Sequence, residues 1–133
     1  SSIMAKSMAY DHPAYQVRHV RGVTIAAGAS TTGRFQAHAD LLAVRGYAMP
    51  SKAGTSANET VIIYKVATSG GATTALGTIT LGASASITGA QVDLADASIA
   101  QGDEVRFLSG TDATMIIDAA LEYQIKPGAD LND

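Results

Sequence analysis

The most regular pattern in the chain is an alternation of side chains over residues 115–125. Its odd positions are all apolar or small, whereas its even positions include Asp118 and Glu122. A period of two is typical of a β-strand that buries one face, and a helix would mix these acids into its apolar stripe. The pattern therefore predicts a long strand over residues 113–125, which Pro127 ends because proline has no N–H to donate.

The same alternation predicts which side chains form the core. Side chains at odd positions of this strand, and of the shorter strand before it, are expected to point between two sheets: Val105, Phe107, Ile117, Leu121 and Tyr123. Asp118 and Glu122 are expected on the opposite face. A strand of thirteen residues would extend on the order of 40 Å, which exceeds the usual length, so we expect a bulge or kink within it.

Eight segments have the length and composition of strands, and stretches rich in Gly, Ser, Asn, Asp and Pro separate them. They cover residues 14–25, 34–49, 59–67, 75–81, 84–88, 90–94, 104–108 and 113–125. The second is expected to bend or break near Asp40, and residues 94–103 can add one helical turn. This spacing predicts an all-β fold, an antiparallel β-sandwich or jelly roll of about eight strands.

Length and composition agree with a single sandwich domain. The 133 residues suffice for one core, which we assign to residues 15–133, preceded by an extended N-terminal arm, residues 1–14. The absence of cysteine excludes a thiol nucleophile and cysteine-ligated zinc. No apolar run approaches the length of a membrane span, and the first residues lack the layout of a signal peptide, so neither a membrane location nor secretion is indicated.

Charge is distributed unevenly along the chain. The first 65 residues contain seven basic and three acidic residues, whereas the remainder contains two basic and nine acidic ones. Strands from the two halves can interleave and cancel this asymmetry, or the asymmetry can provide complementary faces between subunits. The basic residues are dispersed, without the cluster and interleaved aromatic residues of a nucleic-acid surface, so no nucleic-acid partner is expected.

Residues with possible chemistry are few and isolated. His38 and Asp40 have the spacing of one strand face and can hold a metal or orient an imidazole, but the sequence supplies no third ligand, so a surface hydrogen bond is the favoured interpretation. His12 and His19 are interpreted as surface or interface residues. The serines lie outside any nucleophile elbow, and no phosphate-binding loop is present. We therefore expect no catalytic residues, no cofactor and no enzyme activity.

Acidic residues near a predicted connection raise the question of calcium. Asp93, Asp96 and Asp103 can supply oxygen ligands, but their spacing does not match an EF-hand loop. Solvated turn carboxylates are the favoured interpretation, and no metal site is predicted. The tripeptide at residues 58–60 has the letters of a glycosylation sequon, but without a secretory route it is interpreted as a turn.

The first fifteen residues are apolar enough to pack against another polypeptide, although they lack the alternation of a strand. Because Pro13 also disfavours a helix at the residue before it, an extended arm is one interpretation and a flexible leader the other. The candidate contact residues are Ile3, Met4, Met8, Tyr10 and Tyr15.

Three stretches carry a resemblance to a known class of proteins: "VTIAAGASTTGRF", "GTITLGASASITGAQVDLADASIAQGDEVRFLSGTDAT" and "IDAALEYQIKP". They combine a strand of small residues, a "QGDEVRF" turn that leads into an alternating strand, and a long closing strand. In this the chain resembles small β-sandwich proteins of tailed-bacteriophage virions, most of all the head decoration, or cement, proteins.

The resemblance implies a non-enzymatic virion protein that is made in the host cytoplasm and lies on the outer capsid surface. It would bind as a homo-oligomer, most often a trimer, and stabilise the shell by bridging subunits of the major capsid protein. The alternative within the same class is a tail-fibre or receptor-binding module that recognises a host glycan. No catalytic residue carries over from either kind of protein.

Overall fold

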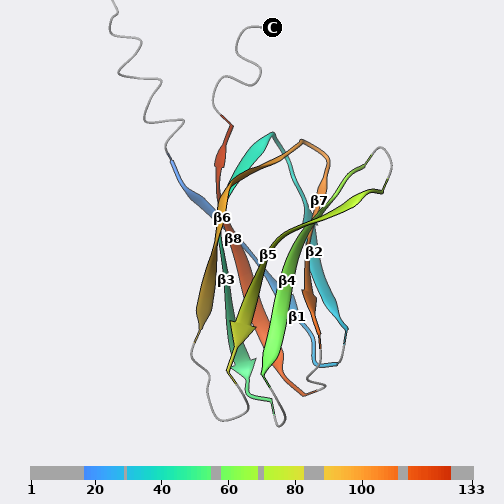
Figure 1. Ribbon diagram of the computed structural model, residues 1–133, viewed down its shortest axis with the longest axis vertical. Helices are drawn as coiled ribbons and strands as arrows, with labels where there is room; N and C mark the ends of the chain where they lie inside the picture. Colours follow the sequence, from blue (N-terminus) through green and yellow to red (C-terminus); the bar gives the residue numbers. More distant parts are fainter. Residues whose placement is uncertain are drawn as a thin grey trace, which may run out of the picture.

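The computed structural model describes residues 17–28, 30–54, 58–68, 71–82, 89–110 and 114–126, which form eight strands (Figure 1). The strands are β1 (His19–Ile25), β2 (Thr32–Gln36), β3 (Leu41–Lys52), β4 (Glu59–Val66), β5 (Thr73–Leu81), β6 (Ala90–Ile99), β7 (Glu104–Ser109) and β8 (Ile116–Ile125). They form two four-stranded antiparallel sheets. The first sheet has the order β1-β8-β3-β6 and the second the order β2-β7-β4-β5.

The strand pairing is that of a jelly roll. Each strand of the first half of the chain pairs with one of the second half, β1 with β8, β2 with β7, β3 with β6 and β4 with β5. The chain is thus one long hairpin that has been rolled into two packed sheets. The predicted all-β sandwich of eight antiparallel strands is confirmed, whereas the predicted arm, residues 1–14, lies outside the described residues.

Most of the predicted strands are present. The second predicted strand is divided into two, and the strand predicted at residues 90–94 is longer than expected. The predicted break near Asp40 is confirmed, since the segment forms two strands, β2 and β3, joined by residues 37–40. The helical turn expected within residues 94–103 is wrong, because β6 continues to Ile99. The strand predicted at residues 84–88 lies outside the described residues.

A bulge in β6 explains why its sequence does not look like a strand. Ala95 and Asp96 have positive φ angles of 56° and 54°, and the carboxylate of Asp93 accepts the N–H of Ala95 at 2.8 Å. Residues 94–96 lie opposite the single residue Val44, since Ala43 pairs with Ala97 and Arg45 with Asp93. Such a bulge breaks the alternation locally while the ladder continues on both sides.

The irregularity expected in the long closing strand lies instead in its neighbour β3. Strand β8 pairs with β1 in an unbroken register, whereas β3 carries extra residues at Val44 and Ser51 relative to β8. Ala43 and Val44 are consequently both buried, and the alternation of β3 changes phase there. The kink predicted within residues 113–125 is therefore wrong.

The predicted core is confirmed. Val105, Phe107, Ile117 and Leu121 have no exposed surface, and Tyr123 is 6% exposed. Asp118 and Glu122 lie on the outer face of the first sheet, as the alternation predicted. The core also receives large side chains from the other strands, among them Ile25, Leu41, Ile63, Ile79, Leu81 and Ile99.

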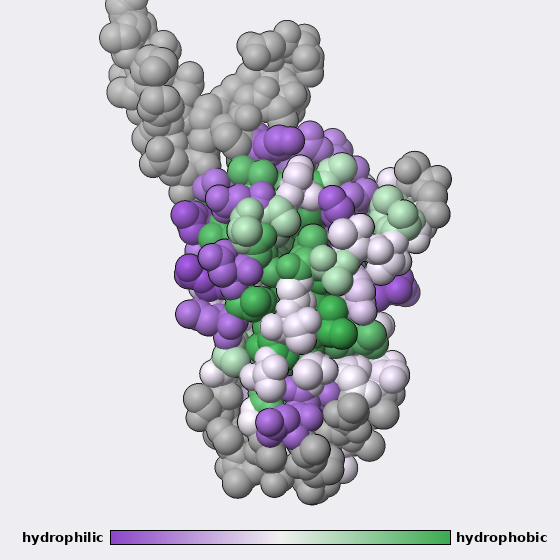
Figure 2. All heavy atoms as spheres, in the orientation of Figure 1, coloured by the Kyte–Doolittle hydropathy of each residue, from purple (hydrophilic) through white to green (hydrophobic). Residues whose placement is uncertain are grey.

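Different contacts join the two sheets at the two sides of the sandwich. On one side the guanidinium of Arg21 on β1 lies 4.6 Å from the centre of the Phe35 ring on β2, a cation–π contact. On the other side β5 and β6 pack directly, because a Cβ atom at Gly77 would lie only 2.8 Å from Leu94. Figure 2 views this second side and shows apolar residues in a band between polar margins.

Charges from the two halves of the chain meet within the fold. Arg18 lies 3.2 Å and Arg45 3.9 Å from the carboxylate of Glu122, and Arg34 lies 3.5 Å from that of Glu104. Each pair joins a basic residue of the first half to an acidic residue of the second. The interleaving of strands thus pairs part of the basic first half with the acidic second half within one chain.

Replacing Leu121 with Ala should lower the free energy of unfolding by about 2–5 kcal/mol, because the side chain is fully buried between the sheets. Urea denaturation measures this, and Gln124→Ala on the outer face of the same strand is the control, with a change within about 0.5 kcal/mol. Equal effects of the two substitutions would contradict the register of β8.

Candidate functional site

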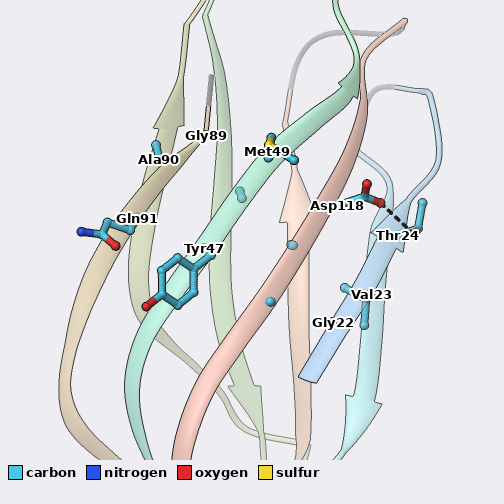
Figure 3. A pocket seen from close by; sticks show the side chains of 12 residues that line it. Gly22, Val23, Thr24, Tyr47, Met49, Gly89, Ala90, Gln91 and Asp118 are labelled. Atoms are coloured by element: carbon cyan, nitrogen blue, oxygen red, sulfur yellow. Dashed lines mark hydrogen bonds between the residues drawn. The ribbon is translucent and has the colours of Figure 1, made fainter. Parts of the chain in front are cut away.

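A groove lies on the outer face of the first sheet. It has a volume of about 880 Å³ and crosses all four strands of the sheet. We call it the outer groove, and Figure 3 shows the residues that line it. They come in four groups of three consecutive residues: 22–24, 47–49, 89–91 and 118–120.

The outer groove exists because small residues occupy the middle of the sheet. One row of paired residues runs across the four strands, from Gly22 through Ala120 and Tyr47 to Gln91. The first two have little or no side chain, so the surface is hollow there, while Tyr47 and Met49 form one wall (Figure 3). Eight of the twelve lining residues are Gly, Ala, Val or Met, which makes the groove mostly apolar.

Three of the four polar side chains that line the outer groove, those of Thr24, Tyr47 and Asp118, already have partners within the fold. The hydroxyl of Thr24 donates to Asp118 at 3.0 Å, the bond drawn in Figure 3. The hydroxyl of Tyr47 donates to Glu122 at 2.6 Å, just beyond the groove. Gln91 completes the polar set at the β6 side. A ligand would therefore meet apolar surface and few polar groups in need of a partner.

A charged cluster borders the outer groove in the neighbouring row of the sheet. Glu122 accepts from Arg18 as well as from Tyr47, and Arg45 lies on its other side. The Tyr47 hydroxyl is the main cause that lowers the pKa of the Glu122 carboxyl, and Arg18 and Arg45 act in the same direction against partial burial. The cluster fixes the orientation of Tyr47 along the groove.

The lining of the outer groove contains few groups that could take part in acid–base or nucleophilic chemistry. Its one carboxylate is Asp118, and no histidine, lysine or second acid is among the residues that line it. A nucleophile paired with a general base, or two carboxylates that share a reaction, would require such neighbours. The groove can accept apolar side chains and an extended backbone, since its floor carries almost no side-chain atoms.

The histidines expected at the surface contact one aromatic ring. His19 stacks on Tyr123 with ring centres 5.3 Å apart, and His38 meets the same ring edge-on at 5.9 Å. The carboxylate of Asp40 accepts the N–H of Gln101 at 2.8 Å. Asp40 thus makes a hydrogen bond, as favoured from the sequence, and this bond joins the residue before β3 to the turn after β6.

Two of the three aspartates considered for calcium have separate structural roles. Asp93 stabilises the bulge of β6, whereas Asp103 is 7% exposed and accepts the N–H groups of Ala100 and Thr68. Asp103 is therefore not the solvated carboxylate that the sequence suggested, because it satisfies buried backbone groups at a turn. Over the described ranges, no three His, Cys, Asp or Glu side chains gather as metal ligands would.

The sequence pattern of residues 58–60 has a structural explanation. Glu59 is fully buried at the start of β4, and its carboxylate accepts the N–H groups of Thr60 at 2.8 Å and Gly110 at 3.0 Å. The carboxylate thereby connects the start of β4 to the end of β7. These residues lie at the start of a strand and not in the turn that we expected.

The candidate contact residues of the arm, Ile3, Met4, Met8, Tyr10 and Tyr15, lie outside the described residues, as does His12. Sequence reasoning did not find the outer groove, because its floor joins Gly22 and Ala120 from distant parts of the chain. The available signal was Ala120, a small residue at an even position of β8 between the polar Asp118 and Glu122. In the part of the chain that the structure describes, no helix is long and apolar enough to cross a bilayer.

No protein-family model and no curated protein matches this sequence. Solved structures with a similar fold include the Drosophila NLP core, described with pentamer formation and histone binding, at 13% identity and a TM-score of 0.47, covering 83% of this chain and 99% of that one. A carbohydrate-binding module from Clostridium stercorarium in complex with cellobiose has 12% identity and a TM-score of 0.44, covering 87% and 91%.

A third similar structure is that of infectious bursal disease virus, Gx strain, at 12% identity and a TM-score of 0.42, covering 86% of this chain and 34% of that one. At these identities and scores, the similarities do not bear on what this chain binds.

Replacing Tyr47 with Phe should lower the free energy of unfolding at pH 7 by on the order of 1 kcal/mol, because the charged Glu122 loses a hydrogen bond. The pKa of Glu122 is lower in the folded protein than its ordinary value of 4.5. The contribution is therefore complete above that ordinary value and is lost as the pH falls through the lowered folded pKa.

Urea denaturation of wild type and variant between pH 7 and pH 3 measures this dependence. The difference should stay constant down to about the ordinary pKa of glutamate and then shrink. Tyr64→Phe on β4 is the control, with a difference that does not depend on pH in this range. A Tyr47→Phe effect that grows toward acid pH would contradict the described bond.

Proposed function

We propose that this chain is a non-enzymatic structural protein of a virion, which decorates and stabilises a phage capsid by bridging subunits of the major capsid protein. The observation that carries the proposal is the outer groove, a mostly apolar furrow in which the polar groups of Thr24, Tyr47 and Asp118 are already bonded within the fold. Such a surface suits a polypeptide segment of the capsid protein. A docked segment buries apolar side chains and demands few new hydrogen bonds from the groove.

The architecture supports a mechanical role. A jelly roll presents two rigid sheets whose outer faces are free for contacts, and viral capsid proteins are among the proteins that use it. In the first sheet β8 is held on both sides by β1 and β3, so the groove that it floors is built on rigid strands rather than loops. A protein that resists pressure on a shell needs this rigidity and needs no catalytic group.

The N-terminal arm, residues 1–14, belongs to the same proposal. Its apolar residues would bury surface against a capsid or sister subunit, at a cost of about 1–2 kcal/mol in backbone entropy for each ordered residue. Deleting residues 1–12 should leave the sandwich folded by circular dichroism and lower its occupancy on particles. Equal occupancy of truncated and intact protein at matched concentrations would mean that the segment is only a leader without a contact role.

A tail-fibre or receptor-binding module that recognises a host glycan is the second candidate. The observation that favours it is the Tyr47 ring, which lies along the outer groove near Gln91 and can stack on a sugar. Sugar hydroxyls, however, must replace their bonds to water with bonds to the protein. Since Asp118 and Tyr47 are already bonded, the groove offers less than such a ligand requires.

Labelling of virions tests the proposed function directly. An antibody against the chain is applied to purified particles of the phage whose genome encodes it, and gold labels are located by electron microscopy. Labels distributed over the head, with the protein present in amounts comparable to the capsid protein, are the expected result. Labels confined to the tail tip would favour the glycan alternative, and absence from particles would refute both.

Filling the outer groove should abolish docking without unfolding the protein. Ala120→Trp places an indole over the floor, where the side chain is half-buried and points outward. We expect its occupancy on particles that lack the wild-type protein to fall at least about tenfold, which corresponds to about 1.4 kcal/mol. Thr32→Trp, at an exposed position of the second sheet, is the matched control and should bind as wild type does.

A further inference from the structure

The two sheets leave four edge strands among the described residues, β1 and β6 in the first sheet and β2 and β5 in the second. An edge strand exposes alternate backbone N–H and C=O groups that can pair with a strand of another chain. Natural proteins discourage such pairing with charged side chains, bulges or very short edges. The four edges of this protein differ sharply in that protection.

Three of the edges are protected. Strand β1 carries His19 and Arg21, and β2 has five residues with Arg34 at its centre. Strand β6 carries Asp93 and the bulge at residues 95–96, where the chain adopts positive φ angles. Charge or irregular backbone therefore opposes the addition of a further strand at each of these edges.

Strand β5 lacks charged side chains, and its bulge at Leu76 leaves a regular segment of five residues beyond it. Its nine residues, TTALGTITL, carry no charge, and in the described part of the chain β5 pairs with β4 alone. The extra residue of β5 at Leu76 leaves residues 77–81 in unbroken register with residues 59–63. Ile79 and Leu81 point into the core, while Thr78 and Thr80 are exposed on the outer face.

We propose that β5 of one copy pairs antiparallel with β5 of a second copy, so that the two second sheets join into one continuous eight-stranded sheet. A second copy is the favoured partner because β5 is the described edge at which pairing with an identical strand brings no like charges together. The contact uses the same residues on both copies, and a two-fold axis relates them. It therefore closes with two chains, in contrast to the trimer that the resemblance implies.

The sequence of β5 favours one register. If the axis passes at Ile79, then Thr78 lies opposite the partner's Thr80, and the second Thr pair follows by symmetry. Cross-strand threonine pairs are favourable in antiparallel sheets, and both side chains are exposed in the single chain. Residues 77–81 then form an unbulged ladder with five residues of the partner.

The apolar surface beside β5 also favours contact with a second copy. Strands β5 and β6 lie together on the side of the sandwich that Figure 2 shows, where apolar residues form a band. Leu76 of β5 and Val92 and Ala97 of β6 pack on the core but remain partly exposed. A second copy at the β5 edge would remove part of this band from water, which adds hydrophobic stabilisation to the backbone pairing.

Sedimentation velocity of the purified full chain tests the pairing. Wild type should have a mass of about 27 kDa at micromolar concentration, twice the 13.6 kDa of one chain. Thr78→Lys/Thr80→Lys should sediment as a monomer, because four ammonium groups would meet at the axis. Thr32→Lys, at an exposed position on the opposite edge of the same sheet, should remain a dimer.

A covalent test uses the absence of cysteine from the chain. Thr78→Cys/Thr80→Cys should form a disulfide-linked dimer under mild oxidation, since each cysteine faces one of the partner in the proposed register. A wild-type mass of one or three chains, a dimer that the lysine variant leaves intact, or a failure of the cysteine variant to cross-link would each overturn the proposal. None of these outcomes affects the location of the protein on a virion, so this pairing and the proposed function can fail separately.

Discussion

The placement of β8 between β1 and β3 is the constraint on which the structure depends. Its odd-numbered side chains, Ile117, Leu121 and Tyr123 among them, fill the core, and its even-numbered ones form the outer face of the sheet. A shift of one residue would exchange the two faces and expose the core side chains. The same register places Ala120 beside Gly22, so it creates the outer groove as well as the core.

Electrostatics reinforces this register without setting it. The rolled hairpin pairs the basic first half of the chain with the acidic second half, and Glu122 on β8 lies between Arg18 from the segment before β1 and Arg45 on β3. Exposed ion pairs contribute little each, but opposite charges that meet in one alignment penalise the others. The cluster also holds Tyr47 in place through its bond to Glu122, so it links the fold to the wall of the groove.

Local pattern predicted the strands and the core, because a half-buried strand must alternate whatever its partner is. It did not predict which strands pair, since β1 and β8 meet through contacts between opposite ends of the chain. The bulge at Ala95 and Asp96 was missed because non-glycine residues rarely adopt positive φ, and the buried role of Asp103 depends on backbone groups brought close only by folding. The groove was missed for a related reason, since neither Gly22 nor Ala120 has a distinctive sequence signal by itself.

In the proposed function, the outer groove is the surface that meets the capsid. A cryo-electron microscopy map of the intact virion, at a resolution that traces the main chain, tests this most directly. The account predicts that the groove floored by Gly22 and Ala120 faces the shell and holds a segment of the major capsid protein beside Tyr47. A decorated particle in which this groove faces solvent, while another surface of the sandwich contacts the shell, would contradict it.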